Sequence, residues 1–480
     1  MDVDPTQPEV MQQFYMKLYP FKNVFLWLNQ GPQPTRNFTH REFSATLAGD
    51  VYLRYHSWNT ADEFKQSICR LNPSRFEIGA IYNARPKDKK ALRPGALQPL
   101  QRELVFDIDM TDYDGIRTCC SGKGICSHCW GFIAAAVRVL DNALREQFGY
   151  KLLLWVYSGR RGVHCWVSDA DAMALTDDQR RTLMSYLEVI RGSKDSVKKV
   201  NVRGPRGAPL HPALARALRI LNPKEGDKAT PWNFDGLILQ DQDAFAAEDK
   251  WSDLLKLLGD NSMAEALLNE WNDEPSRPSR QKWEDILAQV RKRDVKNRTP
   301  LMQAMEDIIL QYMYPRLDME VSKKRNHLLK APFCVHPSTG RVCVPIDPDH
   351  VDQFDPEKVP TVGQLLAELD SAKRPEGEEG ERHNGAPFDL VLVLLLTTLS
   401  LDWDRTSLKP YVDMLDRHAQ RVMNEARRQR QGGSQRSDFL NLLTRLHSCS
   451  DSRILVPSVR VLHYVSAPVI LGRTHMGSEV

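Results

Sequence analysis

The stretch Glu103-Leu-Val-Phe-Asp107-Ile-Asp109-Met110 predicts a β-strand with one apolar face and one acidic face. Side chains alternate between the two faces of an extended strand, so the apolar residues share the face that belongs in a core: Leu104, Phe106, Ile108 and Met110. Asp107 and Asp109 share the other face, where two carboxylates repel each other unless a cation lies between them. Such a pair suits Mg²⁺, which is usually bound by one or two carboxylates together with substrate phosphates. The alternative is an exposed strand whose polar face is acidic by chance.

A second signal is a predicted hairpin, in which two buried strands, residues 151–157 and 163–167, flank the turn Ser158-Gly-Arg160-Arg161-Gly162. The glycines permit a tight turn, and arginine carries a planar, permanent charge that suits phosphate oxygens. His164 lies on the strand that leaves the turn. Beside the acidic strand, the hairpin predicts a site for a metal-bound triphosphate. Without that neighbour it would be a solvated basic hairpin.

The third signal is a cluster of possible metal ligands, Cys119, Cys120, Cys126, His128 and Cys129. Structural zinc takes four tetrahedral ligands, usually thiolates or imidazoles. The adjacent pair Cys119-Cys120 departs from the usual spacing, so the pattern leaves His128 as an alternative to one of the cysteines. The N-terminus has no secretory pattern, so we expect reduced cysteines and a metal site in preference to a loop disulfide.

Composition and charge bound the class of protein. A chain of 480 residues is long enough for two or three domains with a substantial core. Its 65 basic and 62 acidic side chains nearly cancel, so a nucleic-acid groove would have to come from local clustering of charge. No apolar run reaches the roughly 20 residues needed to span a bilayer, and we expect no membrane association.

Hydrophobic spacing gives a coarse outline of the chain. We expect an amphipathic helix over residues 9–30, mainly strands and turns over 40–170, and helices over most of 170–312. In the helical part the expected helices are residues 179–190, 251–258, 263–271, 283–290 and 301–312, the last starting near Pro300. The apolar run Leu390 to Leu401 lies between linker-like flanks. We interpret it as a partner surface or an insertion that the fold does not need.

In their order along the chain, several motifs resemble those of the small, catalytic subunit of eukaryotic DNA primase, in the archaeo-eukaryotic primase superfamily. The similar stretches are residues 41–55, 104–114, 155–166, 314–322 and 326–342, and the similarity covers most of residues 1 to 370. The resemblance implies an α/β fold: a discontinuous, primase-type catalytic domain with a mixed sheet, a zinc-binding loop and an inserted helical subdomain.

The resemblance also implies roles for individual residues. Two catalytic Mg²⁺ or Mn²⁺ ions would be bound by Asp107, Asp109 and Asp318. The incoming nucleoside triphosphate would be contacted by Arg54, Ser158, Arg160, Arg161, His164, Lys330 and His336, with Glu77 near its sugar. One structural Zn²⁺ would be bound by Cys119, Cys120, Cys126 and Cys129. Local sequence shows Asp318 only as a polar residue that opens a short strand.

The expected organisation follows from the resemblance and the change of composition after residue 370. The catalytic domain would comprise residues 1–170, with the zinc loop at 119–129, and residues 313–370, separated by a helical insertion at 171–312. Residues 371–405 would form a linker with the apolar insertion, and residues 406–480 a C-terminal helical region and tail that includes an Arg-rich helix from Arg417 to Arg430.

The implied activity is synthesis of short RNA primers from ribonucleoside triphosphates on a single-stranded DNA template, by two-metal-ion nucleotidyl transfer. The implied partners are the primase large subunit, as a heterodimer, and the DNA polymerase alpha complex, in the nucleus. Two other hypotheses stay open: a repair-type primase-polymerase, and a zinc-containing nucleic-acid-binding module without catalysis. The zinc loop directly after the acidic strand disfavours the first. The carboxylates disfavour the second, because they repel phosphate.

Overall fold

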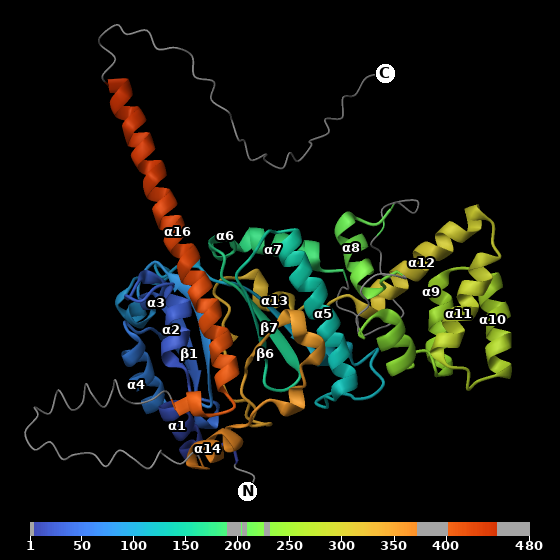
Figure 1. Ribbon diagram of the computed structural model, residues 1–480, viewed down its shortest axis with the longest axis horizontal. Helices are drawn as coiled ribbons and strands as arrows, with labels where there is room; N and C mark the ends of the chain where they lie inside the picture. Colours follow the sequence, from blue (N-terminus) through green and yellow to red (C-terminus); the bar gives the residue numbers. More distant parts are fainter. Residues whose placement is uncertain (1–3, 190–202, 204–208, 225–230, 372–401, 449–480) are drawn as a thin grey trace, which may run out of the picture. The chain divides into compact units, whose positions relative to one another are not determined.

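The computed structural model describes residues 4–189, 203, 209–224, 231–371 and 402–448 (Figure 1). The chain divides into two compact units, residues 1–426 and residues 427–480. All the contacts discussed below lie in the first unit. Helix α16 (Lys409–Ser448) starts in this unit and runs past its boundary.

Two antiparallel sheets form the centre of the first unit. The first sheet has the order β2-β1-β3-β4, with β8 also paired to β3; its strands are β1 (Arg41–Thr46), β2 (Tyr52–His56), β3 (Arg75–Tyr82), β4 (Pro99–Gln101) and β8 (Leu329–Lys330). The second has the order β5-β7-β6-β9; its strands are β5 (Leu104–Asp109), β6 (Leu153–Tyr157), β7 (Gly162–Val167) and β9 (Pro345–Ile346).

Every strand pair in the described residues is antiparallel. The expected mixed sheet is therefore wrong, while the expected combination of helices and sheets is present. The physical reason lies in the connections. Parallel neighbours need a crossover, whereas β6 and β7 are joined by a tight turn and β5 pairs with the far strand of that hairpin.

Strand β5 has the two faces that its sequence predicts. Leu104, Phe106 and Ile108 are fully buried, whereas Asp107 and Asp109 are partly exposed. The acidic face therefore opens toward solvent at the end of the strand, and the apolar face is part of the core.

The N-terminal helical prediction needs a correction, because residues 9–30 form two helices. Helix α1 (Pro8–Lys17) and helix α2 (Phe21–Asn29) are separated at Pro20. Proline has no backbone N–H and disfavours helical geometry in the residue before it. The aromatic side chains on either side of the break still pack together, with the ring centres of Tyr19 and Phe21 4.6 Å apart. Helix α4 (Ala61–Leu71) joins this core through Phe64, 4.9 Å from Phe21.

The expectation of strands and turns over residues 40–170 missed helix α5 (Ser127–Glu146), which connects β5 to β6. Most of its N-terminal half is buried, and a side chain at Gly131 would meet the ring of Trp232 at 2.5 Å. The helix was missed because an apolar, alanine-rich helix that is buried on most sides lacks the polar spacing of an amphipathic one.

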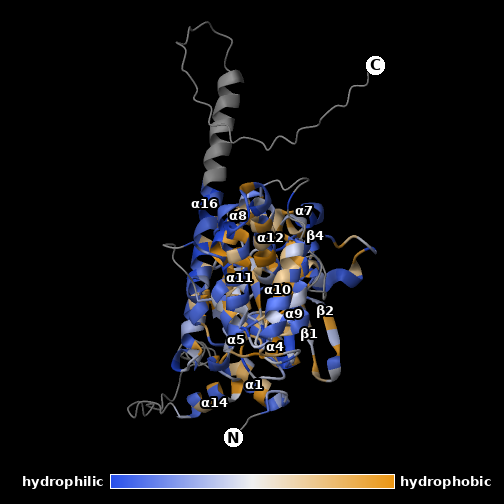
Figure 2. Ribbon diagram, turned by 90° about the vertical axis from the view of Figure 1, so that its right-hand side faces the viewer, coloured by the Kyte–Doolittle hydropathy of each residue, from blue (hydrophilic) through white to orange (hydrophobic). Residues whose placement is uncertain are grey.

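The helical block follows α6 (Ala170–Ala174) and contains the expected helices with small changes at their ends. The expected ones are α7 (Asp177–Leu187), α9 (Glu248–Leu258), α10 (Asn261–Asp273), α11 (Ser279–Arg291) and α12 (Val295–Met313). Two further helices, α8 (Pro212–Leu221) and the π-helix η4 (Phe234–Asp241), were not predicted. Figure 2 shows both hydrophilic and hydrophobic residues in α9, α10 and α11, as expected of amphipathic helices. Pro300 does not start the last helix but lies inside α12, whose first turn is capped by Asp294.

The remaining elements are α3 (Arg36–Thr39), α13 (Met319–Lys323), α14 (Val362–Ser371) and short 3-10 helices such as η2 (Pro86–Ala91), η3 (Met110–Tyr113), η5 (Pro348–Gln353) and η7 (Asp402–Arg405). The expected Arg-rich helix is part of α16. The apolar run 390–401 lies outside the described residues. No helix in the described part of the chain is both long and apolar enough to cross a membrane.

A buried ion pair joins the two sheets. The guanidinium of Arg41 on β1 donates to both carboxylate oxygens of Glu103, just before β5, at 2.7 and 2.9 Å. Both side chains are at most 1% exposed. The pair therefore couples the start of β1, an inner strand of the first sheet, to the start of the strand that carries the acidic face.

We predict that Glu103→Ala lowers the free energy of unfolding by about 3–5 kcal/mol, because it leaves the Arg41 charge buried without its partner. Glu103→Gln should cost less, since an amide still accepts one hydrogen bond. Chemical denaturation measures both. The control is Lys256→Ala, which removes a surface pair with Asp253 and should leave the transition almost unchanged. Equal transitions for Glu103→Ala and the control would contradict a role for the buried pair.

Candidate active site

The third aspartate lies beside the first because two distant segments hydrogen-bond through their backbones. The N–H of Asp318 donates to the carbonyl of Asp107 at 3.0 Å. Asp318 does not open a strand, as its local sequence suggested, but caps helix α13, where its carboxylate accepts from the N–H of Glu320 at 2.9 Å. This contact brings a carboxylate from far along the chain to the acidic end of β5.

Burial and neighbouring carboxylates raise the pKa of two carboxyl groups at this site, Asp107 and Asp112. Burial, followed by the charges of Asp318 and Asp109, raises the pKa of Asp107 to about 7. The same causes raise the pKa of Asp112, which follows the strand. For Asp109, burial alone would raise the pKa, but hydrogen bonds from Arg161 and Thr111 outweigh it and hold the pKa below its usual value. The site therefore has an excess of negative charge that a cation would neutralise.

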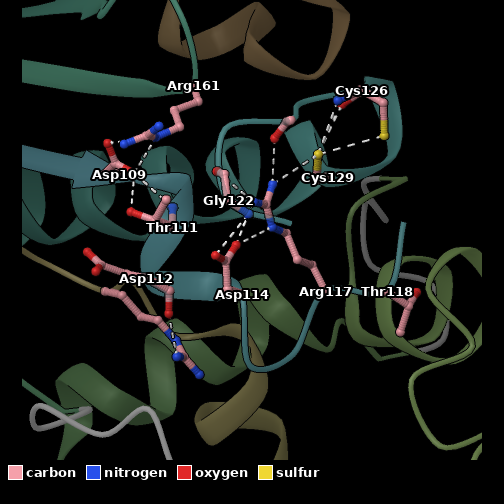
Figure 3. Close-up of polar contacts among 12 residues, drawn as sticks. Asp109, Thr111, Asp112, Asp114, Arg117, Thr118, Gly122, Cys126, Cys129 and Arg161 are labelled. Atoms are coloured by element: carbon pink, nitrogen blue, oxygen red, sulfur yellow. Dashed lines mark hydrogen bonds and ion pairs between the residues drawn. The ribbon is translucent and has the colours of Figure 1, made fainter. Parts of the chain in front are cut away.

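Arg161 provides part of that positive charge. Its Nε donates to the two oxygens of Asp109 at 2.8 and 3.1 Å, and the N–H and hydroxyl of Thr111 donate to the same carboxylate at 2.8 and 2.6 Å (Figure 3). With Asp109 held in this way, the three aspartates do not form a ligand cluster as tight as that of the cysteines in the described residues. The guanidinium of Arg161 occupies the place at Asp109 that a metal cation would take. The carboxylate oxygens of the three aspartates are hard donors, which fit a divalent ion such as Mg²⁺.

The hairpin between β6 and β7 is held by its own backbone and by Ser158. The N–H of Ser158 donates to the carbonyl of Gly162 at 2.9 Å, and its hydroxyl accepts from the N–H of Gly162 at 3.0 Å. The hydroxyl of Tyr157 donates to the carbonyl of Arg160 at 2.8 Å. The predicted turn at 158–162 is confirmed as a turn, and it carries Arg161 to the acidic end of β5, where this side chain pairs with Asp109.

Strand register brings the hairpin to the aspartates. Asp107 pairs with His164, and Asp109 pairs with Gly162. The Nε2 atom of His164 lies 3.7 Å from the nearer carboxylate oxygen of Asp107. Burial, followed by the charge of Lys330, lowers the pKa of His164 to about 3. The imidazole is therefore neutral at physiological pH and can act as a hydrogen-bond donor without adding charge.

Lys330 bridges the two sheets at the turn. On β8 it pairs with Glu77 of β3, and its Nζ donates to the carbonyl of Ser158 at 2.5 Å. Lys330 therefore belongs to the first sheet through its backbone, while its ammonium group contacts the turn of the second sheet.

His336 packs directly against the same turn. A Cβ atom at Gly159 would lie 2.7 Å from the Cβ of His336, and the hydroxyl of Thr339 donates to the carbonyl of Gly159 at 2.7 Å. Burial, followed by the charges of Lys330, Arg160 and Arg161, lowers the pKa of His336 to about 4. The basic side chains therefore surround this histidine and form one electropositive group beside the aspartates.

Arg54 and Glu77 lie on the first sheet and are paired with other side chains. Arg54 donates to both oxygens of Glu42 at 2.9 and 3.2 Å. Glu77 accepts from the hydroxyls of Ser44 and Tyr52 at 2.9 and 2.6 Å. Burial, followed by Glu77, raises the pKa of Tyr52 to about 12. Glu77 is connected to Lys330 through the pairing of β3 with β8. Neither Arg54 nor Glu77 makes a hydrogen bond or an ion pair with the turn at 158–162 in the described residues.

The four cysteines form a separate site. The Sγ atoms of Cys119, Cys120, Cys126 and Cys129 all lie within 4.8 Å of one another. A tetrahedral zinc with Zn–S bonds of 2.3 Å would place its sulfurs about 3.8 Å apart, so the cluster fits a closed metal site with small adjustments. His128 is outside the cluster, because its Nδ1 atom pairs with Asp241.

Arg117 supports the cysteine loop and has no sequence signal. Its guanidinium donates to the carbonyls of Gly122 and Gly124 at 3.1 and 2.9 Å and approaches the Sγ of Cys129 at 3.7 Å (Figure 3). A cation so close to thiolates would offset part of the charge of a four-cysteine zinc site.

The sequence analysis also missed Thr111, which donates to the carboxylate of Asp109. An aspartate that caps a helix and accepts from the residue two positions later is a known pattern.

An acidic strand facing an arginine-bearing hairpin is the kind of site that takes a metal-bound, phosphorylated substrate. The family model that matches this chain is that of the DNA primase small subunit, over residues 106–348. The chain is 48% identical over 375 residues to the DNA primase small subunit of Schizosaccharomyces pombe, which covers 78% of this chain and 80% of the relative. The chain therefore belongs to the DNA primase small subunit family.

Two further relatives have the same printed description. The DNA primase small subunit of Saccharomyces cerevisiae is 44% identical over 373 residues, covering 75% of this chain and 85% of the relative. That of Drosophila melanogaster is 39% identical over 374 residues, covering 76% and 83%. The resemblance inferred from the motifs is thus confirmed.

We predict that the purified protein contains about one zinc per chain, because four converging thiolates complete a tetrahedral shell. Cys126→Ser should remove the metal and lower the thermal midpoint together, since binding energy at such a site is folding energy. Elemental analysis and thermal unfolding measure the two effects. Cys165→Ser, at a buried cysteine outside the cluster, is the control that should keep its metal. Full stability without metal would contradict the site.

Proposed function

We propose that Asp107, Asp109 and Asp318 carry nucleotidyl transfer in this chain, a DNA primase that synthesises RNA primers as the catalytic subunit in DNA replication. The observation that carries the residue assignment is the backbone contact between Asp318 and Asp107, opposite the hairpin with Arg161 and His164. This contact gives a reason for three carboxylates to share one small volume in spite of their repulsion.

The reaction joins two nucleotides. The 3′-hydroxyl of one ribose attacks the α-phosphorus of the incoming ribonucleoside triphosphate, and pyrophosphate leaves. The three aspartates would hold two divalent ions, Mg²⁺ or Mn²⁺, and such ions stabilise both the attacking and the leaving oxygen. The carboxylates fix the position of the site on β5 and α13, two elements that are anchored in the core. No side chain is assigned as general base.

Arg161 would change partners when the substrate binds. In the described conformation it neutralises Asp109. A substrate that arrives with its own cations makes this pair unnecessary, and the guanidinium can then take the phosphate oxygens, which suit its planar fork. The exchange keeps Asp109 paired at every stage, so the site never holds an isolated buried charge.

The other hairpin contacts would bind the β- and γ-phosphates and align the triphosphate for in-line attack. Lys330 and Arg160 supply positive charge. His164 and His336, both kept neutral by burial and by the nearby cations, supply hydrogen bonds. Ser158 lies in the same turn. We place Arg54 and Glu77 farther out, Glu77 toward the ribose, because both are held by partners on the first sheet.

The zinc would be structural. The four cysteines occupy all the positions of a tetrahedral ion, which leaves none for a substrate. Their loop follows η3 and leads into α5, so a bound zinc would fix the chain directly after the acidic strand. Arg117 would hold the loop in place on one side, and the pair between His128 and Asp241 would hold it on the other.

The assembly is also part of the proposal. A small subunit implies a larger partner subunit, and we propose a heterodimer within the DNA polymerase alpha complex, acting in the nucleus on single-stranded DNA. We further propose that residues 1–170 and 313–370 form the catalytic domain around the insertion at 171–312, with residues 371–480 as linker and C-terminal region. Product made from ribonucleotides alone on unprimed DNA would favour this role over a repair-type primase-polymerase.

We predict that Asp107→Ala, Asp109→Ala and Asp318→Ala each reduce primer synthesis to background, because each removes a metal ligand. In the absence of divalent ions, Asp107→Ala should be at least as stable as the parent protein, since it removes a repelled, buried carboxylate. Primer extension and thermal unfolding measure the two effects. Asp112→Ala is the control: a nearby carboxylate with no assigned ligand role, which should keep most of the activity. An inactive control, or an active Asp109→Ala, would contradict the assignment.

We predict that Gly159→Ala weakens nucleotide binding because its methyl group would displace His336. The matched control is Gly149→Ala, since Gly159 and Gly149 have φ values of +88° and +75° but a Cβ at Gly149 meets nothing within 4 Å. Both variants carry the left-handed backbone penalty of about 1–2 kcal/mol. Only the first should raise the KM for the incoming nucleotide. An equal KM in the two variants would show that the turn does not hold the triphosphate.

A further inference from the structure

A cavity of about 950 Å³ lies at the outer part of the first sheet, next to Arg54. Its walls come from the end of β2, the end of β3, the 3-10 helix η2 and the loop that leads to β4. The lining includes Arg54, Tyr55, His56, Tyr82, Lys87, Lys89, Lys90, Arg93 and Asn326. The volume falls within the range of cavities that bind ligands, about 300–1,000 Å³.

The cavity is strongly basic. Five of its lining side chains are cationic, Arg54, Lys87, Lys89, Lys90 and Arg93, and no carboxylate lines it. Arg54 and Lys87 pair with Glu42 and Glu63 outside the lining. Lys90 and Arg93 are exposed and take part in no ion pair within the described residues. The whole chain is almost neutral, with a net charge of +3. The positive charge of this wall is therefore a local concentration, of the kind that attracts phosphates.

An aromatic ring lies within this basic wall. Tyr55 has a φ of +67°, which is an outlier for a bulky side chain, and such strained residues cluster at functional sites. The Nζ of Lys89 lies 3.5 Å from the centre of its ring, and the guanidinium carbon of Arg54 lies 5.0 Å from it. Basic grooves with an aromatic ring are typical of proteins that bind single-stranded nucleic acid, whose bases stack on the ring.

Polar contacts connect the cavity to the active site. Glu42, which holds Arg54, also accepts from the hydroxyl of Tyr82 at 2.8 Å. Both Arg54 and Tyr82 line the cavity. On the same sheet, Tyr52 bonds to Glu77, the strand partner of Lys330. Asn326, also in the lining, lies in the segment that leads to Lys330. The cavity therefore shares Arg54 with the residues assigned to the nucleotide, and the first sheet connects it to Lys330.

We propose that this cavity binds the sugar–phosphate backbone of a single nucleic-acid strand next to the active site, with a base stacked near Tyr55. The inference rests on the proposed function, since it extends the same site. The same phosphate chemistry has two possible sources here. One is the DNA template, and the other is the 5′-triphosphate end of the new RNA.

The test is the double variant Lys90→Ala with Arg93→Ala in the full chain, because these two side chains are exposed and make no ion pair in the described residues. The matched control is Lys22→Ala with Arg70→Ala, an exposed lysine and arginine outside the cavity. Equal thermal midpoints would show that both variants fold. Fluorescence anisotropy with labelled single-stranded dT20, without nucleotides, measures the first source over a series of salt concentrations.

We expect the cavity variant to bind dT20 roughly tenfold more weakly and to lower the slope of log K against log salt by about 1.4, the value for two lost phosphate contacts on a single strand. That result assigns the cavity to the template. A second arm compares primed templates whose RNA carries a 5′-triphosphate or a 5′-hydroxyl. A loss confined to the triphosphate form assigns the cavity to the new RNA.

The inference is overturned if the cavity variant equals the parent protein in both arms, or if the control pair loses as much. The binding assay does not depend on catalysis. A parent protein that binds dT20 through these residues but makes no primer would overturn the proposed function and leave the cavity assignment intact. If the cavity variant binds dT20 more weakly but keeps the normal KM for nucleotide, the cavity acts on the nucleic-acid strand and not on the incoming triphosphate.

Discussion

Mutual repulsion among carboxylates is the constraint on which the rest of this structure depends. Asp107, Asp109 and Asp318 occupy neighbouring positions, and burial together with like charge raises the pKa of Asp107 to about 7. Such an arrangement persists only if other interactions over-determine it. The apolar face of β5, the six-residue pairing with β7 and the backbone bond from Asp318 supply them.

Positive charge reaches this site from several segments of the chain. Arg161 comes from the turn of the second sheet and Lys330 from the first sheet. Because Lys330 also donates to Ser158, the position of the turn depends on both sheets. The buried pair between Arg41 and Glu103 links the same sheets at the other end of β5. Neither sheet could shift without disturbing a charge that the interior has to keep paired.

The cysteine loop and the basic cavity are two further features of the chain outside this centre. A metal held by the four cysteines would fix the chain that follows β5 and η3. The cavity lies on the outer part of the first sheet and collects positive charge that the chain as a whole does not have. The two proposed sites therefore differ: the triphosphate site lies among partly buried side chains of both sheets, whereas the cavity proposed for a nucleic-acid strand has exposed basic side chains in its wall.

Local sequence determined the parts of this protein that depend on neighbours along the chain. The alternation in residues 104–110 determined the two faces of β5, the glycines determined the turn at 158–162, and apolar spacing determined most helices of the block. The family resemblance added Asp318, Lys330 and His336. The effect of proline on helix ends was harder to predict. Apolar spacing predicted one helix over residues 9–30, but the chain forms two helices separated at Pro20, whereas Pro300 lies inside α12.

Only the tertiary structure decided what depends on distant segments meeting. The antiparallel order of both sheets, the helix cap at Asp318 and the pairing of Arg161 with Asp109 have no local pattern. The separation of His128 from the cysteines depends on Asp241, and the basic cavity depends on Asn326 lying near residues 54–99. The physical reason is that hydrogen bonds and Coulomb interactions depend on distance in space, whereas periodicity and turn chemistry are properties of adjacent residues.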